Sequence, residues 1–335
     1  MRILVTGHTG FKGSWLSLIL NELGHEVSGL SLSPEGESHF ELSRISDCIQ
    51  SDLRADIRSY SLVEDFIKET DPEFIFHLAA QPLVKASYRD PIYTYEVNVN
   101  GTLHVLKAAS RASNLKGMLV ITTDKVYSNE SNSSRAFTEH DALGFGDPYS
   151  TSKAMADLLT QSWMRDSKPP IGIARAGNVV GGGDFAADRL IPDLIKNTKL
   201  GKPTLIRYPN AVRPWQYVLD CLYGYVLQMQ DVVRGNSSIF NFGPCPEEYF
   251  EVRQVADGVS NRIQACDWDK DTGENPFEAN FLTLDSTQAE TCLNWRNKFN
   301  FEETLDLTTD WYYHYLNGKD LDKVSRKQVK EYLNI

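Results

Sequence analysis

The sequence has no apolar run near the length that crosses a membrane and no signal peptide before its first strand-like segment, RILVTG. It also lacks low-complexity tracts and a repeat period, which excludes disordered and solenoid architectures. Hydrophobic residues make up 41% and charged residues 24% of its 335 positions, as in an ordinary globular protein. These features predict a cytoplasmic protein without a membrane segment.

Basic residues are fewer than acidic ones. The chain has 34 Lys and Arg against 45 Asp and Glu, which gives a formal net charge of −11. A protein that binds the phosphate backbone of nucleic acids needs a basic face, so no nucleic-acid partner is expected. Any anionic ligand must instead be held by a local group of residues.

Cysteines are few, odd in number and scattered, without C-x-x-C spacing. Free thiols in a reducing compartment are therefore expected rather than disulfides, and no metal site is predicted. All five are interpreted as structural: Cys48, Cys221, Cys245, Cys266 and Cys292.

Strand-like and helix-like segments alternate through the first half of the chain. This alternation predicts βαβ units in an α/β fold with a doubly wound parallel sheet. Beyond about residue 176 turn residues become frequent, which predicts a second, smaller lobe with segments that return to the sheet. The expected strands lie in 2–7, 25–32, 72–80, 117–122 and 171–180, with a further strand before Asp56, and the expected helices in 13–24, 61–70, 95–112 and 147–166.

A glycine-rich loop, TGHTGFKG, joins the first strand to the first helix. Gly7, Gly10 and Gly13 are spaced three apart, as G-x-x-G-x-x-G. Glycine is needed where backbone approaches a pyrophosphate and a helix N-terminus faces the anion. The position of the loop between a strand and a helix favours dinucleotide binding.

The end of the second strand, GLSLSPEGE, indicates which dinucleotide is bound. Ser31 and Ser33 stand where an acidic residue would bind the ribose 2′-hydroxyl, and no Lys or Arg stands there to meet a 2′-phosphate. NAD is therefore favoured over NADP. Asp56 and Ile57 follow the third strand, where they either clamp the adenine or, for Asp56, cap the helix that starts near Ser59.

Two groups of polar residues stand out at element boundaries. Tyr149 and Lys153 are four apart in PYSTSK and share a helix face, so the ammonium is expected to lower the phenol pKa. Thr123, Asp124 and Lys125 follow the apolar run GMLVIT. Such groups are costly to bury unless they are paired or functional. Asp124 and Lys125 form either a buried ion pair or a catalytic pair, although consecutive strand residues point to opposite faces.

The motifs TGHTGFKG, HLAAQ, NVNG, TTDKVY and YSTSK occur in the order found in the extended short-chain dehydrogenases, and the chain resembles that family. Over nearly its whole length it is most similar to the branch of 4,6-dehydratases that act on CDP-glucose. The segments HLAAQPLVKASYRDP, ARAGNVVGGGDFAADRLIPD and RPWQYV carry this similarity. Other nucleotide-sugar 4,6-dehydratases usually have glutamate where this branch, like this chain, has lysine, at Lys125.

The resemblance implies a Rossmann-type NAD-binding domain at 1–175 and a substrate-binding lobe at 176–335. It implies an NAD-dependent nucleotide-sugar dehydratase, with CDP-glucose the favoured substrate and a homodimer or higher homo-oligomer as the assembly. The helices of NVNGTLHVL and YSTSKAMADLL would form the subunit contact. Apolar side chains there either line that contact or belong to the core: Leu103, Val105, Leu106, Leu158 and Leu159.

The resemblance also implies catalytic roles. Tyr149 acts as acid and base on the sugar 4-hydroxyl, Thr123 hydrogen-bonds the same hydroxyl, and Lys153 holds the nicotinamide ribose and Tyr149. Asp124 protonates the departing 6-hydroxyl. Lys125, or a water that it positions, takes the C5 proton, or else Lys125 anchors the substrate diphosphate.

The resemblance further implies two sets of binding residues. The cofactor set is Gly7, Thr9, Gly10, Phe11, Gly13, Asp56, Ile57, Leu78, Ala79, Ala80, Asn98, Tyr149 and Lys153. The substrate set is Gln81, Ser87, Asn178, Arg189 and Arg213. Two of these have plainer alternatives, since Arg213 could be a surface residue beside a turn and Asn178 a turn-forming residue.

Three other functions stay open. The chain could be a 4-epimerase, a dehydratase of another nucleotide sugar, or a cofactor-binding regulator without turnover. The presence of Thr123, Tyr149 and Lys153 disfavours the regulator. The loop YSNESNSS at 127–134 differs from its counterpart in the CDP-glucose branch, which leaves the identity of the sugar open.

Overall fold

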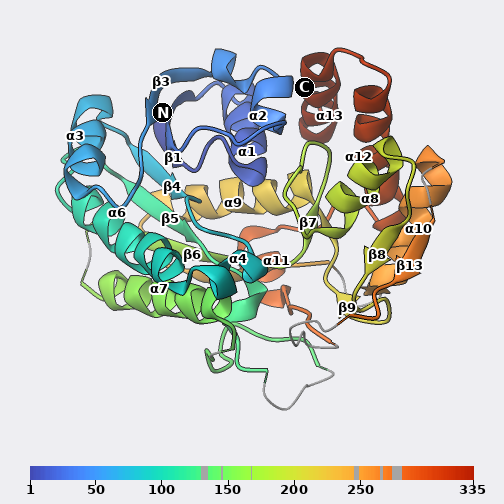
Figure 1. Ribbon diagram of the computed structural model, residues 1–335. Coiled ribbons are helices and arrows are strands. Elements are labelled where there is room, and N and C mark those ends of the chain that lie inside the picture. Colours follow the sequence, from blue (N-terminus) through green and yellow to red (C-terminus); the bar gives the residue numbers. More distant parts are fainter. Residues whose placement is uncertain (130–134, 145, 167, 245–248, 265–266, 274–280) are drawn as a thin grey trace.

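A seven-stranded parallel sheet forms the centre of the protein (Figure 1). The structure, a computed structural model, describes residues 1–129, 135–144, 146–166, 168–244, 249–264, 267–273 and 281–335. The strand order is β11-β6-β5-β4-β1-β2-β3. The strands are β1 (Arg2–Thr6), β2 (Glu26–Ser31), β3 (Ile49–Arg54), β4 (Phe74–His77), β5 (Gly117–Ile121), β6 (Ile171–Ala176) and β11 (Ile239–Phe242).

Helices cover both faces of this sheet, because successive strand residues point to opposite sides and both sides are apolar. On β1, Ile3 and Val5 belong to one core and Leu4 to the other. Figure 1 shows two groups of helices on opposite faces. One group is α3 (Tyr60–Thr70), α6 (Thr102–Ala109) and α7 (Pro148–Met164), and the other is α1 (Phe11–Glu22) and α9 (Val218–Val233). The predicted Rossmann-type doubly wound fold is confirmed.

The helix predicted at 95–112 is composite. It begins as α5 (Pro91–Tyr95), passes through a π-helical segment (Glu96–Gly101) and continues as α6. At Gly101 the helix approaches Ile57 so closely that a Cβ would lie 2.5 Å from the Ile57 Cδ1 atom. π-Helical segments of this kind frequently occur at functional sites.

The second half of the chain contributes to the sheet and to a set of helices beside it. β11 pairs with β6 and extends the sheet, and α9 packs on β5 and β6 and covers one of its faces. The division at 175 and 176 stays a prediction. Short strand pairs join β7 (Val179–Val180) to β10 (Gln216–Tyr217), β9 (Val212–Arg213) to β12 (Phe250–Glu251), and β8 (Thr204–Ile206) to β13 (Trp268–Lys270).

The remaining helices surround this framework. They are α2 (His39–Leu42), α4 (Val84–Arg89), α8 (Leu190–Lys199), α10 (Val252–Ile263), α11 (Thr287–Leu293), α12 (Phe301–Leu316) and α13 (Leu321–Leu333), with short 3₁₀ turns at Ile45–Cys48 and Asp124–Val126. Within the described ranges, no helix has the length and apolarity that crossing a membrane requires. Cys48 and Cys221 are buried and Cys292 is exposed, all as free thiols, whereas Cys245 and Cys266 lie outside the described residues.

Candidate active site

The direction of strand order reverses at β1, which pairs with β2 on one side and β4 on the other. In sheets of this type, ligands bind outside the carboxyl ends of the strands at this point. Gly7 follows β1, and Leu78, Ala79 and Ala80 follow β4. The Leu78 N–H donates to the Thr6 carbonyl at 3.1 Å, which holds the two strand ends together.

In the glycine loop, backbone segments approach one another so closely that side chains would not fit at Gly7 and Gly13. Gly7 has φ +78°, and a Cβ there would lie 2.7 Å from the Ala79 nitrogen. A Cβ on Gly13 would lie 2.0 Å from the Gly7 carbonyl oxygen. Phe11 begins α1 directly after Gly10, and within the described residues neither a side-chain cap nor an acidic first-turn residue occupies that helix end. The loop therefore fits a dinucleotide pyrophosphate.

The end of β2 lies beside a basic residue of the neighbouring strand β3. The Thr9 hydroxyl, a predicted cofactor contact, hydrogen-bonds with the Ser31 hydroxyl at 2.8 Å. Arg54 on β3 is the register partner of Ser31, and Asp52 accepts a 2.6 Å hydrogen bond from its guanidinium. The segment after β2 itself contains no Lys or Arg, as the sequence analysis states, and the guanidinium of Arg54 on β3 is paired with Asp52. The preference for NAD over NADP is therefore unchanged.

Asp56 and Ile57 lie beside the π-helical segment. The Asp56 carboxylate accepts hydrogen bonds from the Arg58 backbone N–H at 2.8 Å and from its Nε at 3.0 Å. Ser59, not Asp56, is the N-cap residue of α3, so the capping alternative is wrong. The predicted contact of Asp56 and Ile57 with adenine stays a prediction.

Thr123, Asp124 and Lys125 leave β5 through a 3₁₀ turn. The Thr123 hydroxyl donates to Asp124 Oδ1 at 2.8 Å, and Lys125 Nζ lies 3.5 Å from the same oxygen. The chain turns here instead of continuing as a strand, so the two consecutive side chains meet, contrary to expectation. Asp124 is only 1% exposed, and its Oδ2 has no hydrogen-bond partner in the described part of the chain.

Tyr149 and Lys153 lie on the first turns of α7, which Asp147 caps by accepting from the Ser150 N–H. Burial raises the pKa of Tyr149 to about 12, while an interaction with Thr123 opposes the rise. Lys153 Nζ donates to the Ile121 carbonyl at 2.8 Å, and burial lowers the pKa of Lys153 to about 7. The expectation that Lys153 lowers the Tyr149 pKa is therefore wrong, because desolvation of the phenol dominates.

Three predicted binding residues form hydrogen bonds that hold the backbone next to Tyr149 and Lys153. The Ser87 hydroxyl accepts from the Tyr149 N–H at 3.1 Å. Asn98 accepts from the Gln81 N–H at 2.8 Å and donates to the Gln81 carbonyl and to the Ser152 hydroxyl. These bonds fix the segment after β4 against α7, and the predicted ligand contacts of Gln81, Ser87 and Asn98 stay predictions.

Two predicted substrate residues of the second half, Asn178 and Arg213, belong to segments that meet next to Asp124 at Gly177. A Cβ on Gly177 would lie 2.3 Å from Pro214 Cγ and 3.2 Å from Asp124 Oδ2, so the segment with Arg213 packs beside the acid. Arg213 is 6% exposed, which contradicts the surface alternative. The Asn178 carbonyl accepts from the Gln216 N–H at 3.0 Å.

Arg189 faces the same space. Its Nη1 donates to Asp184 Oδ2 at 2.7 Å, and its charge also acts on Tyr149. Coulombic attraction to Asp184 raises the pKa of Arg189, which keeps this guanidinium charged. Its predicted contact with the substrate stays a prediction.

Two further features were missed by sequence reasoning. Lys12 Nζ donates to the Tyr225 hydroxyl on α9 at 3.2 Å, although a lysine in a first helical turn is normally read as exposed. Asp157 and Arg175 form a fully buried bidentate pair, with both distances 2.8 Å. Asp157 follows Lys153 by one helical turn, and this spacing is the signal that could have found it.

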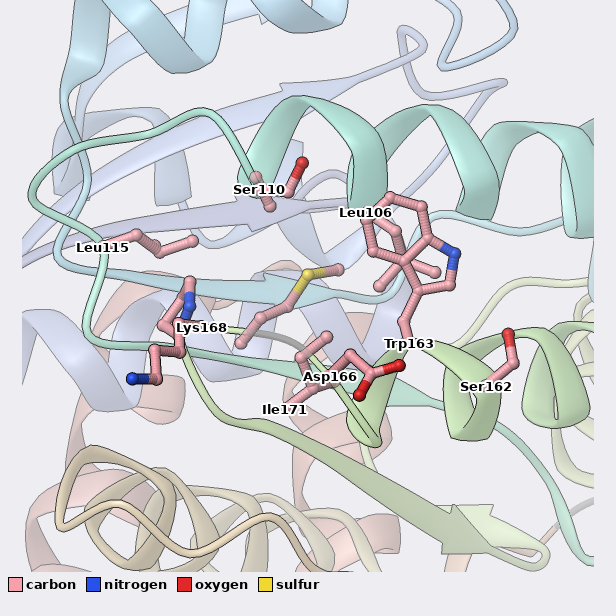
Figure 2. Close-up of a pocket in the computed structure, with 11 residues that line it drawn as sticks. Leu106, Ser110, Leu115, Ser162, Trp163, Asp166, Lys168 and Ile171 are labelled. Atoms are coloured by element: carbon pink, nitrogen blue, oxygen red, sulfur yellow. The ribbon is translucent and has the colours of Figure 1, made fainter.

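A separate cavity of about 380 Å³ lies between α6 and α7 (Figure 2). Its apolar wall includes Leu106, Met118 and Trp163, and Lys168 and Asp166 lie at its polar side. None of the predicted site residues in the described chain lines it. We therefore place the active site at the strand ends and not in this cavity.

The sequence model of the NAD dependent epimerase/dehydratase family matches residues 3–243. The chain belongs to this family. One member, CDP-glucose 4,6-dehydratase of Salmonella typhimurium, is 38% identical over 99% of this chain and 96% of that protein. A second, dTDP-glucose 4,6-dehydratase of Haemophilus influenzae, is 28% identical over 93% of this chain and 98% of that protein.

Solved structures of the epimerase/dehydratase family share the fold. UDP-glucose 4-epimerase of Thermotoga maritima superposes with a TM-score of 0.82, 22% identity, and coverage of 95% of this chain and 100% of that one. dTDP-glucose 4,6-dehydratase of Bacillus anthracis, in complex with NAD, has a TM-score of 0.81, 22% identity, and coverage of 95% and 98%. The predicted family and dependence on NAD are confirmed.

Proposed function

We propose that the protein is an NAD-dependent nucleotide-sugar 4,6-dehydratase that converts CDP-glucose to CDP-4-keto-6-deoxyglucose. The observation that carries this proposal is the 38% identity with a CDP-glucose 4,6-dehydratase over 99% of the chain. The dTDP-glucose 4,6-dehydratase from Haemophilus influenzae reaches 28% over 93%. The acid and amine at Asp124 and Lys125, which meet beside Tyr149, supply the groups that an elimination requires.

The loop from Gly7 to Gly13 and the free N–H groups of α1 would hold the pyrophosphate of NAD, and Lys153 would hold its nicotinamide ribose. When bound, the cofactor supplies the oxidation of sugar C4 and the later reduction of C6. Lys153 keeps a hydrogen bond to the Ile121 carbonyl, so its ammonium is fixed between β5 and α7.

Tyr149, in its phenolate form, starts the reaction by taking the proton of the 4-hydroxyl, which Thr123 orients. The Tyr149 hydroxyl and the Thr123 hydroxyl interact with each other, so both reach the same sugar oxygen. The ordinary phenol state of Tyr149 is also a proton donor, which suits the return of this proton at the end of turnover.

The 4-ketone acidifies the neighbouring C5–H, and the two groups after β5 then complete the elimination. Lys125, in its neutral form or through a water, removes the C5 proton. Asp124, in its protonated form, donates to the departing 6-hydroxyl, so the C6–O bond breaks and water leaves. Asp124 Oδ2 is buried and without a partner among the described residues, and it is the oxygen available for that donation.

The proposal includes a cytoplasmic homodimer. On α6 and α7, Leu103 and Leu158 are 37% and 54% exposed, whereas Val105 and Leu106 are buried in the core. Together with Met155, the exposed side chains offer an apolar face for a second copy. Nucleotide sugars and NAD are supplied in the cytoplasm, which fits this location.

Incubation with CDP-glucose, dTDP-glucose and UDP-glucose in separate reactions tests the function. A 4-keto product, seen by its absorbance in alkali, is expected with CDP-glucose and should form at least tenfold more slowly with the other two. A new hexose without deoxygenation would instead identify an epimerase. Unchanged substrate in all three reactions would identify a binding protein.

A further inference from the structure

The 3₁₀ turn after β5, Asp124–Val126, is fixed at its start by Thr122. The Thr122 hydroxyl is buried and donates to Asp157 Oδ2 on α7 at 3.0 Å. Tyr149 lies on the same helix, two turns earlier. The start of the turn, which carries Thr123, is therefore tied to the helix that carries the base of the oxidation step.

The end of the same turn is fixed by Tyr127, the residue that follows it. The Tyr127 side chain is buried, and its ring stacks on Phe137 with ring centres 5.1 Å apart. Its hydroxyl donates to Asn241 Oδ1 on β11 at 2.6 Å and accepts from Arg175 Nη1 on β6 at 2.9 Å. The end of the turn is therefore held by two neighbouring strands of the sheet.

The two anchors meet in one buried ion pair. Asp157, which binds Thr122, accepts two hydrogen bonds of 2.8 Å from Arg175, which binds Tyr127. Hydrogen bonds thus run from one end of the turn, through the ion pair, to its other end. Phenylalanine at position 127 could stack on Phe137 in the same way, so the hydroxyl is needed for the connection to Arg175 and not for packing.

The groups assigned to the elimination step lie inside the turn and depend on its backbone. Asp124 Oδ1 accepts from the adjacent Thr123 hydroxyl, and Oδ2 has no partner among the described residues. Lys125 Nζ lies 3.5 Å from Asp124 Oδ1. Burial raises the pKa of Tyr127 to about 12, so its hydroxyl stays protonated and serves as a hydrogen-bonding group.

We propose that Tyr127 is a positioning residue for the elimination step, whose hydroxyl holds the end of the turn so that Asp124 and Lys125 reach C6 and C5 of the sugar. Displacement of reacting groups by about 1 Å can slow a step by about 100-fold. Oxidation of C4 should be spared, because Thr122 still ties the start of the turn to α7. The inference rests on the proposed dehydratase reaction.

Rapid mixing of the enzyme and NAD with CDP-glucose separates the two steps, because reduced nicotinamide absorbs once C4 is oxidised and disappears when C6 is reduced after elimination. In Tyr127→Phe the absorbance should rise within about twofold of the wild-type rate and decay about 10- to 100-fold more slowly. Thr122→Val releases the other end of the turn and should slow the rise. Tyr313→Phe, at an exposed ring of α12, should change neither rate.

Equal slowing of the rise and the decay in Tyr127→Phe would overturn the proposal and indicate a general structural role, and unchanged rates would overturn it as well. Thermal unfolding shows whether Tyr127→Phe is folded. If it is not, Asn241→Leu, which removes the acceptor of the same hydroxyl, should slow the decay and spare the rise. A wild-type protein that forms no deoxygenated product would refute the proposed function together with this role, whereas a normal wild type beside a normal Tyr127→Phe refutes the role alone.

Discussion

Asp124 combines deep burial with a carboxylate oxygen that no described residue satisfies. A buried polar atom without a partner costs stability, and such atoms are retained where they serve chemistry. Gly177 lies between Pro214 and Asp124 Oδ2, since a Cβ on it would approach both, so this oxygen lies near the segment that carries Arg213. The structure thereby joins the predicted acid to a predicted substrate-binding residue.

Replacing Asp124 with Asn should stop the reaction after C4 oxidation, because an amide cannot deliver the proton that the departing 6-hydroxyl needs. We expect the rate of 4-keto-6-deoxy product formation to fall by a factor of about 100 to 10,000. Reduced cofactor should accumulate on the enzyme, as seen by its nicotinamide absorbance. Product formation at the wild-type rate would remove Asp124 from the mechanism.

Lys125→Met separates two roles for this amine, since methionine keeps the length of the side chain and removes the nitrogen. If Lys125 transfers the C5 proton, solvent deuterium should enter C5 more slowly by a factor of at least about 100. The affinity for CDP-glucose should change less than about threefold. Persistent exchange with weakened affinity would show that Lys125 anchors the diphosphate instead.

The sequence predicted which of these residues cluster, but not how they meet. The order of TTDK and YSTSK placed both motifs at strand and helix ends on one side of a parallel sheet. The contact between Asp124 and Lys125 depends on the 3₁₀ turn after β5, which strand alternation does not indicate. Lys12 was missed because its environment is created by α9, more than 200 residues later in the chain.

At the scale of elements, a buried ion pair fastens α7 to the sheet. Arg175 on β6 donates two hydrogen bonds to Asp157 on α7, and a third to the Tyr127 hydroxyl at 2.9 Å. Thr122 donates to the same carboxylate at 3.0 Å. The helix that carries Tyr149 and Lys153 is thus held to the strand end that carries Thr123.

Asp157→Ala should lower the free energy of unfolding by about 3 to 5 kcal/mol, because it leaves the Arg175 guanidinium buried without its anion. Urea unfolding measures this change. The double variant Asp157→Leu with Arg175→Met removes both charges and should be more stable than Asp157→Ala. As a control, Lys327→Met breaks an exposed pair with Glu331 and should cost less than about 1 kcal/mol. Equal effects of Asp157→Ala and Lys327→Met would contradict this account.

Helices and strands were predicted correctly where an apolar run or a helical period in the local sequence indicates them. The strands at β1, β2, β4, β5 and β6 and the helices at α1, α3 and α7 lie where apolar runs and periodicity placed them. The predicted helix at 95–112 was correct in position but not in its π-helical segment, which depends on the contact of Gly101 with Ile57. β11, with the sequence IFNF, is interrupted by Asn241 and lies where turn residues are frequent, so no continuous apolar run marks it as a strand.

Across the whole molecule, His39 joins the two ends of the chain. Its ring hydrogen-bonds with the Ser14 hydroxyl of α1 at 2.8 Å and the Ser325 hydroxyl of α13 at 3.0 Å. It also stacks on Trp15 with ring centres 4.2 Å apart. Burial lowers the pKa of His39 to about 3, so the folded protein holds this ring neutral.

This burial predicts loss of stability in acid. The unfolded chain protonates His39 near pH 6.5 and the folded chain only near 3, so stability falls as pH drops through that interval. For His39→Gln, which cannot be protonated, the fall between pH 6.5 and 4 should be smaller by about 3 kcal/mol. Urea unfolding at both pH values measures it. Burial also lowers the pKa of His77 to about 3. Because His77 is present in both the wild type and His39→Gln, its contribution cancels when the two proteins are compared. An identical fall in the two proteins would contradict the assignment to His39.

The late position of β11 and α9 affects synthesis on the ribosome. When the first 176 residues have emerged, β6 is the outermost strand on its side, and its unpaired backbone groups are exposed until Ile239–Phe242 arrive. The face of β5 and β6 that α9 later covers is also open during this interval. The nascent chain therefore exposes an unpaired strand edge while about 60 further codons are translated. At a translation rate of about 5 to 20 residues per second this takes roughly 3 to 12 seconds. During that interval, pairing of this edge with another chain competes with folding.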